Sequence, residues 1–151
     1  MGRFYFSYGY GILLGMNAAT LIIADSEKNA NLYYATRFLA PDPLIFVQMN
    51  GRRAVVMSDL ELDRARAQAV VDEVLSYTKL SQAAKRRGVA EPTTADVVDE
   101  VLRGQGVTAL EVPFDFGVAH ADALRSLGYT VRSTPDPFFP ERMVKSEEEI
   151  A

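Results

Sequence analysis

Hydrophobic positions recur along this chain at two spacings, every second residue in some stretches and every third or fourth in others. The first spacing is typical of strands and the second of amphipathic helices, so the sequence predicts a mixture of the two. Two apolar runs, residues 44–49 and 53–57, flank Asn50-Gly51. This dipeptide between strand-like runs is the strongest short signal for a β-hairpin, and a type I′ turn is expected there.

Further strands are predicted from β-branched and aromatic runs that end at turn residues. These segments are residues 20–24, 31–38, 74–77, 109–112 and 129–133. The aromatic-rich segment 31–38 is predicted to be extended up to the break at Pro41-Asp42-Pro43. In a strand, neighbouring side chains face opposite sides, so Tyr34 is expected in the core and Tyr33 away from it.

Helices are predicted where capping residues precede an apolar stripe. Ser58 to Glu61 has capping-box spacing ahead of a helix over about 60–69, and a short helix over 80–87 is closed by Gly88. Thr93 or Thr94 caps a third helix, and a fourth covers about 117–127. The residues expected to face inward from the last two helices are Val97, Val98, Val101, Leu102, Ala123, Leu124 and Leu127.

The order of these elements predicts the fold class. A hairpin comes first and strand–helix–strand units follow, which is typical of an α/β domain with a mixed β-sheet and flanking helices. A further capping box, Ser146 to Glu149, opens a helix where the sequence stops. Because a complete domain rarely closes on a fresh helix start, we expect this chain to be the front part of a longer protein.

Composition excludes several classes of partner. The 151 residues carry a net charge of −4 and no cysteine. No nucleic-acid or anionic-membrane partner is therefore expected, and a reducing cytoplasm is the expected location. The apolar segment 11–24 is too short to span a bilayer and is broken by Asn17 and Thr20, so a buried strand is expected there.

His120 is the only histidine, and Asp115 and Asp122 lie near it in the sequence. Residues two apart on a helix point to nearly opposite sides, so His120 and Asp122 are not expected to bind one ion. We expect a half-buried histidine bonded to a backbone group. The sequence also lacks a G-x-S-x-G nucleophile elbow, so no catalytic residue and no metal ligand is assigned.

One alternative function rests on Asp25 and Asp59, which each follow an apolar strand. This pattern resembles the acidic Mg²⁺ pocket of a phosphoacceptor receiver domain, in which parallel strands end side by side. The hairpin at Asn50-Gly51 argues against it, because it removes the helix that should intervene and makes the second strand antiparallel to its neighbour. A free-standing receiver-like binding or signalling module remains the alternative hypothesis.

Two segments resemble the amino-terminal domain of the creatinase/prolidase/aminopeptidase P family. Residues 31–38 (NLYYATRF) are similar to its "aromatic–Tyr–x–Thr–Gly–Phe" segment, except that Arg37 stands where glycine is usual. Residues 110–112 and 128–131, followed by 142–150 (RMVKSEEEI), are similar to its closing half and to its "R-x-x-K-S-x-x-E-I" signature. The resemblance implies that residues 1–140 form this domain and that 141–151 begin the helix leading to a catalytic domain beyond this chain.

The resemblance also implies a function. The domain would have a ribonuclease-H-like α/β fold, would not itself be catalytic, and would serve oligomer assembly and substrate access in an Xaa-Pro metallopeptidase. The missing catalytic domain would hold two divalent metal ions (Mn, Zn or Co) and act on proline-containing peptides. The domain's partners would be that catalytic domain and further copies in a homodimer or homotetramer. Tyr33 would enter the partner subunit's active site with Tyr34 and Arg37 beside it; the alternative is that Tyr33 only packs within a sheet.

Overall fold

The computed structural model describes the chain from Asn17 to Met143. Its strands are β1 (Ala18–Ala24), β2 (Leu44–Met49), β3 (Arg52–Met57), β4 (Glu73–Ser76), β5 (Ala109–Pro113) and β6 (Thr130–Thr134). Its helices are α1 (Ala30–Thr36), α2 (Leu62–Gln68), α3 (Tyr77–Arg86), α4 (Thr94–Leu102) and α5 (Val118–Ser126), with 3₁₀ turns η2 (Asp59–Glu61) and η3 (Pro140–Met143). Residues 144–151, which carry the predicted helix start and most of the closing signature, lie outside the described residues, as does the front of segment 11–24.

The strands form one mixed sheet in the order β4-β3-β2-β1-β5-β6, as the predicted fold class requires. Strand β2 is antiparallel to β1 and β3, while the pairs β1–β5, β3–β4 and β5–β6 are parallel. The predicted hairpin joins β2 to β3. Asn50 and Gly51 both have positive φ, 51° and 77°, which is the backbone of a type I′ turn.

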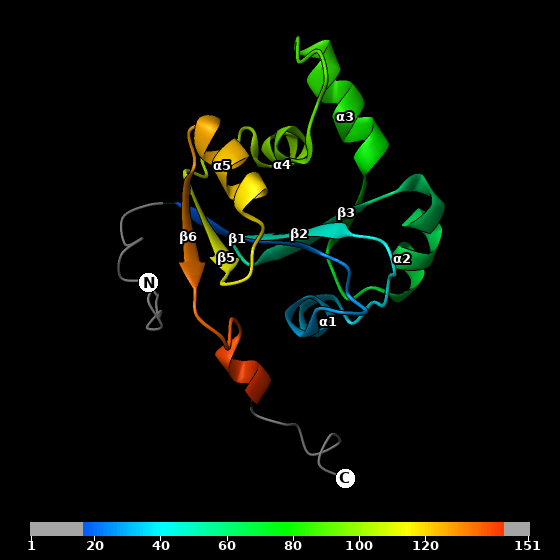
Figure 1. The fold of residues 1–151 in the computed structure, drawn as a ribbon. Helices are drawn as coiled ribbons and strands as arrows, with labels where there is room; N and C mark the ends of the chain where they lie inside the picture. The colour runs from blue at the N-terminus through cyan, green and yellow to red at the C-terminus, as the bar shows by residue number, and fades with distance from the viewer. Residues whose placement is uncertain (1–16, 144–151) are drawn as a thin grey trace.

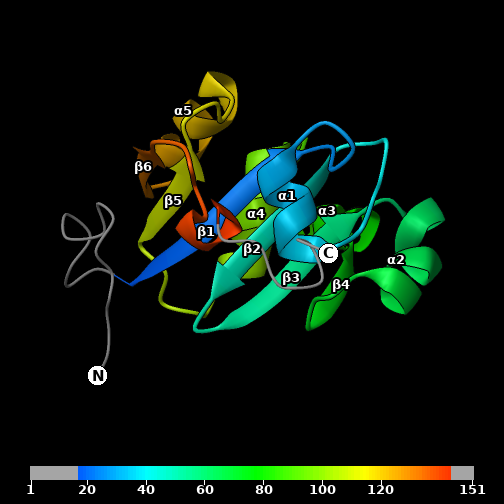
Figure 2. The same cartoon turned by 90° about the horizontal axis from the view of Figure 1, so that it is seen from below.

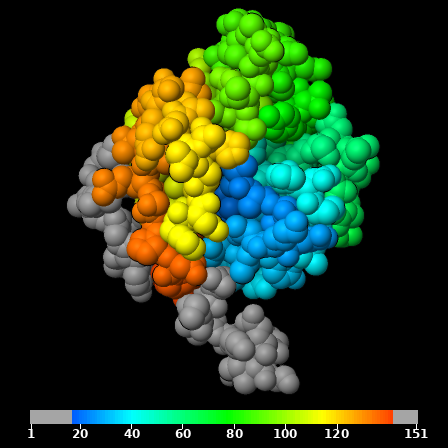
Figure 3. Space-filling model, viewed as in Figure 1, coloured from blue at the N-terminus to red at the C-terminus, as the bar shows by residue number. Residues whose placement is uncertain are grey.

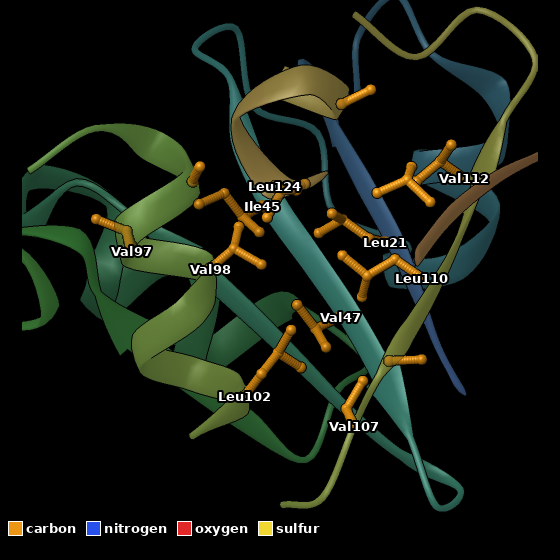
Figure 4. Packing of buried hydrophobic residues seen from close by; sticks show 14 of the residues in the cluster. Leu21, Ile45, Val47, Val97, Val98, Leu102, Val107, Leu110, Val112 and Leu124 are labelled. Carbon is orange, nitrogen blue, oxygen red and sulfur yellow. The ribbon is translucent and has the colours of Figure 1, made fainter. Parts of the chain in front are cut away.

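Alternation along the strands divides the core between the two faces of the sheet. On one face, residues of β1, β2 and β5 pack against α4 and α5, and α3 lies on the same side (Figures 1 and 4). Figure 4 shows Leu21, Val47 and Leu110 from the strands meeting Val98 and Leu102 of α4.

The other face of the sheet is covered by α1 and by the segment that leads into η3 (Figure 2). Phe46 and Val55 point from the strands to this side, and Leu32 of α1 packs on them. The segment after β6 contributes Phe138 and Phe139, both buried. A single chain thus closes both faces of the sheet, and its last described residues lie next to its first helix.

The prediction of an extended strand over residues 31–38 is wrong, because most of this segment belongs to helix α1 (Ala30–Thr36). The Oδ1 atom of Asn29 accepts a hydrogen bond from the backbone N–H of Leu32 and caps the helix. Within α1 the buried residues Leu32, Ala35 and Thr36 are three and four positions apart, a helical spacing that seats one face of α1 on the sheet. This packing outweighs the β propensity of the two tyrosines and the threonine.

Two smaller expectations about helices are also wrong. The capping box at Ser58 does not form, since the Ser58 side chain makes no cap bond and the Glu61 carboxylate pairs with Arg64 instead. Leu127 was expected to face inward, but it follows the end of α5 and is 43% exposed. The capping box of α4 forms in full, with the Thr93 side chain accepting from Asp96 N and the Asp96 side chain accepting from Thr93 N.

None of the helices within residues 17–143 is long and apolar enough to cross a bilayer.

Candidate functional site

The candidate site is the carboxyl end of α1, where the three residues named by the resemblance lie together. The helix ends at Arg37, whose backbone is left-handed (φ 54°, ψ 26°) and whose N–H donates to the carbonyl oxygen of Tyr33. A left-handed residue directly after a helix is the usual place for glycine, because a side chain crowds this conformation. This chain carries an arginine in that conformation, at the position where the segment that it resembles would have glycine.

Arg37 lies beside both tyrosines. Its guanidinium carbon is 5.9 Å from the centre of the Tyr33 ring and 5.3 Å from that of Tyr34. At these distances a cation attracts the electron-rich ring faces. The contacts hold the Arg37 side chain back along the helix, over the turn that precedes it.

The two tyrosines have different surroundings. Tyr33 is 37% exposed. In Figure 3 the blue part of the chain, which contains α1, lies at the surface of the molecule. The ring of the half-buried Tyr34 lies 5.5 Å from that of Phe139, in the segment after β6. The expectation that strand alternation separates them is wrong, because successive helical residues point about 100° apart. Tyr33 nevertheless faces outward and Tyr34 packs inward.

The loop after α1 is held by α2. The Arg64 guanidinium lies 4.3 Å from the centre of the Phe38 ring, and its Nη2 donates to the carbonyl oxygen of Leu39 at 3.0 Å. On the other side, the backbone N–H of Ala40 donates to the Ser26 Oγ at 2.8 Å. The loop is therefore held from two sides, and the side chain of Leu39 on it is 51% exposed.

Sequence reasoning missed Phe139 as a neighbour of Tyr34, and it missed Arg64 as the residue that holds the loop after α1. Arg64 and Phe139 come from elements 25 or more residues away, and no local pattern marks them. The one available signal was the spacing of Leu32, Ala35 and Thr36 after Asn29, which is that of a capped helix.

His120 and its neighbouring aspartates are not brought together as a metal site. His120 is half-buried, as expected, but its ring lies 6.0 Å from that of Phe116, and the described structure gives its side chain no backbone hydrogen bond. Asp122 pairs with Arg125 at 3.4 Å. Within residues 17–143 no group of three or more His, Cys, Asp or Glu side chains could hold a metal ion.

The two aspartates of the receiver hypothesis do not converge. Strands β1 and β3 run in the same direction, so their carboxyl ends lie at the same end of the sheet, but β2 lies between them. The Asp25 Oδ1 accepts from the backbone N–H of Lys28, and the Asp59 Oδ1 accepts from the hydroxyl of Ser76. Each carboxylate is thus used locally, in a turn and between neighbouring elements.

Comparison with known proteins relates the fold to peptidases. No protein-family model and no curated protein matches the sequence. Among solved structures, X-Pro aminopeptidase from Thermotoga maritima MSB8 matches with a TM-score of 0.68 and 17% identity over 90% of this chain and 36% of that chain. Prolidase from Pyrococcus furiosus matches with a TM-score of 0.62 and 11% identity over 95% of this chain and 36% of that chain.

A third match is a separate amino-terminal domain. It is the creatinase/prolidase N-terminal domain of an X-Pro dipeptidase from Streptococcus pyogenes, with a TM-score of 0.53 and 17% identity over 82% of this chain and 86% of that chain. This chain spans about a third of the length of the aminopeptidase and of the prolidase. The chain therefore has the fold of a creatinase/prolidase N-terminal domain.

Proposed function

We propose that this chain is the non-catalytic amino-terminal domain of an Xaa-Pro metallopeptidase of the aminopeptidase P or prolidase type. In this proposal it serves oligomer assembly and substrate access, with its own catalytic domain and further copies of itself as partners. The proposal is supported by the fold, which the chain shares with about a third of X-Pro aminopeptidase and prolidase structures and with a creatinase/prolidase N-terminal domain. The catalytic domain would bind two divalent metal ions and supply the attacking hydroxide.

The observation that carries the substrate-access role is the exposure of Tyr33 beside Arg37. An aromatic ring at the end of a capped helix, with a cation held against it, is a rigid group available to a neighbouring molecule. A tyrosine that enters the cleft of a partner subunit would stack on the apolar ring of proline and exclude water. Leu39, on the loop that follows α1 and is held by Arg64, is a further exposed apolar side chain.

The first test is the reading frame beyond Ala151. We expect a stretch of roughly 200 or more residues, a usual size for one further domain, with spaced Asp, Asp, His, Glu and Glu ligands. A frame that closes without such a stretch would contradict the proposal for this chain.

The second test is Tyr33→Ala in that longer protein. We expect kcat/KM for an X-Pro peptide to fall roughly 5- to 150-fold, which corresponds to the loss of about 1–3 kcal/mol of stacking and desolvation, with metal content and melting temperature nearly unchanged. Tyr33→Phe should retain most of the activity, because the ring is kept. Tyr34→Ala should instead lower the melting temperature, since it removes the contact with Phe139.

Two results would count against the substrate-access role. Unchanged kinetics in Tyr33→Ala, together with lower stability, would mean that the ring only packs. A longer protein that sediments as a monomer with full activity would remove the role across subunits.

A further inference from the structure

A cavity of about 200 Å³ lies on the face of the sheet that α3 and α4 cover (Figure 1). It is at the end of the sheet where Leu44 begins β2 and Met57 ends β3, and the carboxyl ends of strands are where open α/β sheets bind their ligands. Its floor is one apolar row across three strands, because Ile23 pairs in register with Ile45, and Ile45 with Val56. Figure 4 shows Ile45 on this face of the sheet.

Hydroxyl groups complete the lining of the cavity. Tyr77 is the first residue of α3 and Thr94 the first of α4, and both are half-buried. Their hydroxyl oxygens are 3.2 Å apart and share one hydrogen bond, so the second proton of this pair is left to donate elsewhere. Ser58 and Thr78 add two further hydroxyl groups that are exposed to solvent. The cavity thus combines an apolar floor with a half-buried hydroxyl pair.

The lining also restricts the charge and the size of a ligand. None of the described residues that line the cavity has a charged side chain. Burying an ion among neutral groups is costly, so an uncharged molecule fits this cavity better than an ion. Since an apolar cavity of about 150 Å³ holds benzene, a volume of about 200 Å³ has room for one ring and a small polar substituent.

We propose that this cavity binds a neutral molecule made of one ring with one hydrogen-bonding substituent. The ring lies on the row of Ile23, Ile45 and Val56, where its burial supplies the hydrophobic gain. The substituent bonds to the hydroxyl pair of Tyr77 and Thr94, which fixes its orientation. The inference goes beyond the proposed function and does not depend on it, because α1 and its tyrosines lie on the opposite face of the sheet.

A titration of the 151-residue chain with benzamide, followed by the NMR shifts of its methyl groups, tests this proposal. The methyl groups of Ile23, Ile45 and Val56 should shift saturably, with a Kd of about 1 mM or lower. Those of Val55 and Val74, which belong to the core on the other face, should not shift. Benzoate has the same size but carries a charge, so it should bind at least about tenfold more weakly.

Three results of this titration would overturn the proposal. The first is the absence of saturable shifts at the floor residues. The second is an equal affinity for benzoate, because the site would then not select a neutral ligand. The third is a shift at Val55 and Val74 as large as that at Ile45, which would mean binding without a defined site.

A variant that lacks the hydroxyl pair tests the second half of the proposal. Tyr77→Phe combined with Thr94→Val replaces both partners by apolar groups of similar shape, a change that costs a fold little. Its affinity for benzamide should fall about 2- to 10-fold, the loss expected for one hydrogen bond, while its affinity for benzene should stay at the wild-type value. Thr130→Val, at an exposed threonine of β6 outside the lining, is the control and should bind benzamide like the wild type.

An unchanged affinity of the double variant for benzamide would overturn the role of the hydroxyl pair. An equal loss of affinity for benzene would do the same, because the variant would then have lost the cavity rather than a hydrogen bond. The titration of the wild type decides whether the cavity binds a ligand even where the variant does not fold.

Discussion

At the scale of single residues, Arg37 shows how a local conformation can be kept against the preference of its side chain. Its φ of 54° lies in the left-handed region, where glycine is at ease and a β-branched residue is strained. The backbone bond to Tyr33 and the ring contacts of its guanidinium offset part of that cost.

Substitutions of Arg37 distinguish the left-handed helix end in the structure from the extended conformation that the sequence predicts for this segment. Arg37→Gly should be at least as stable as the wild type, while Arg37→Val should lose about 1–2 kcal/mol in the free energy of unfolding from urea melts. Arg66, in the regular part of α2, is the control, and there glycine should be less stable than valine. A valine variant of Arg37 more stable than the glycine variant would contradict the left-handed helix end.

A second notable residue is Glu111, whose buried carboxyl group lies on β5, the strand next to the edge strand β6. It is 4% exposed on β5 and pairs in register with Thr20 of β1 and Arg132 of β6. Burial raises the pKa of the Glu111 carboxyl above its ordinary value, while the hydroxyl of Thr134, which donates to its Oε1 at 2.6 Å, and the charge of Arg132 oppose that shift.

The raised pKa of Glu111 has a definite consequence for stability. The folded state holds the proton more tightly than the unfolded state, so the stabilisation is complete below the unfolded pKa and is lost as the pH rises through the folded pKa. Glu111→Gln keeps a neutral group of the same size, so its unfolding free energy relative to the wild type should rise over that pH range. A difference between Glu111→Gln and the wild type that stays flat over that pH range would refute the assignment.

At the scale of elements, the hairpin and α1 represent two ways of forming structure. The hairpin turn is set by two residues with positive φ, and its pairing of Met49 with Arg52 follows directly. Helix α1 has seven residues, too few to be stable alone, and depends on its cap at Asn29 and on packing against the sheet.

The turn can be tested at Gly51. An added Cβ at this position would meet no atom within 4 Å, so any cost of substitution comes from the backbone alone. Gly51→Val should lose about 1–3 kcal/mol in unfolding free energy, whereas Gly51→Asn should lose much less because asparagine tolerates positive φ. Equal urea midpoints for the two variants would show that the type I′ turn is not needed.

At the scale of the whole molecule, the arrangement of layers assigns different roles to the two faces of the sheet. Helices α3, α4 and α5 close one face, and the other carries α1, the loop held by Arg64 and the segment after β6 with Phe138 and Phe139 (Figures 1 and 2). The candidate access residues and the end of the described chain therefore share one face. The oligomeric state, the cytoplasmic location, and the expectation that this chain binds no metal while a missing domain binds two ions stay predictions.

The sequence by itself determined the elements whose signals are local. The Asn50-Gly51 turn, the Thr93 cap of α4 and the apolar strands need only neighbouring residues, because their φ angles and short-range hydrogen bonds are decided within a few positions. These elements suffice for the α/β class with a mixed sheet.

The tertiary structure alone decided the features that depend on distant partners. Segment 31–38 became a helix because Leu32, Ala35 and Thr36 could be buried on the sheet, a gain in burial that local propensity does not contain. The same holds for the contact of Tyr34 with Phe139, more than a hundred residues away, and for Arg64 on the loop after α1. The residues of the candidate site could be named from a motif, but whether each faces solvent or the core follows from packing between elements far apart in the chain.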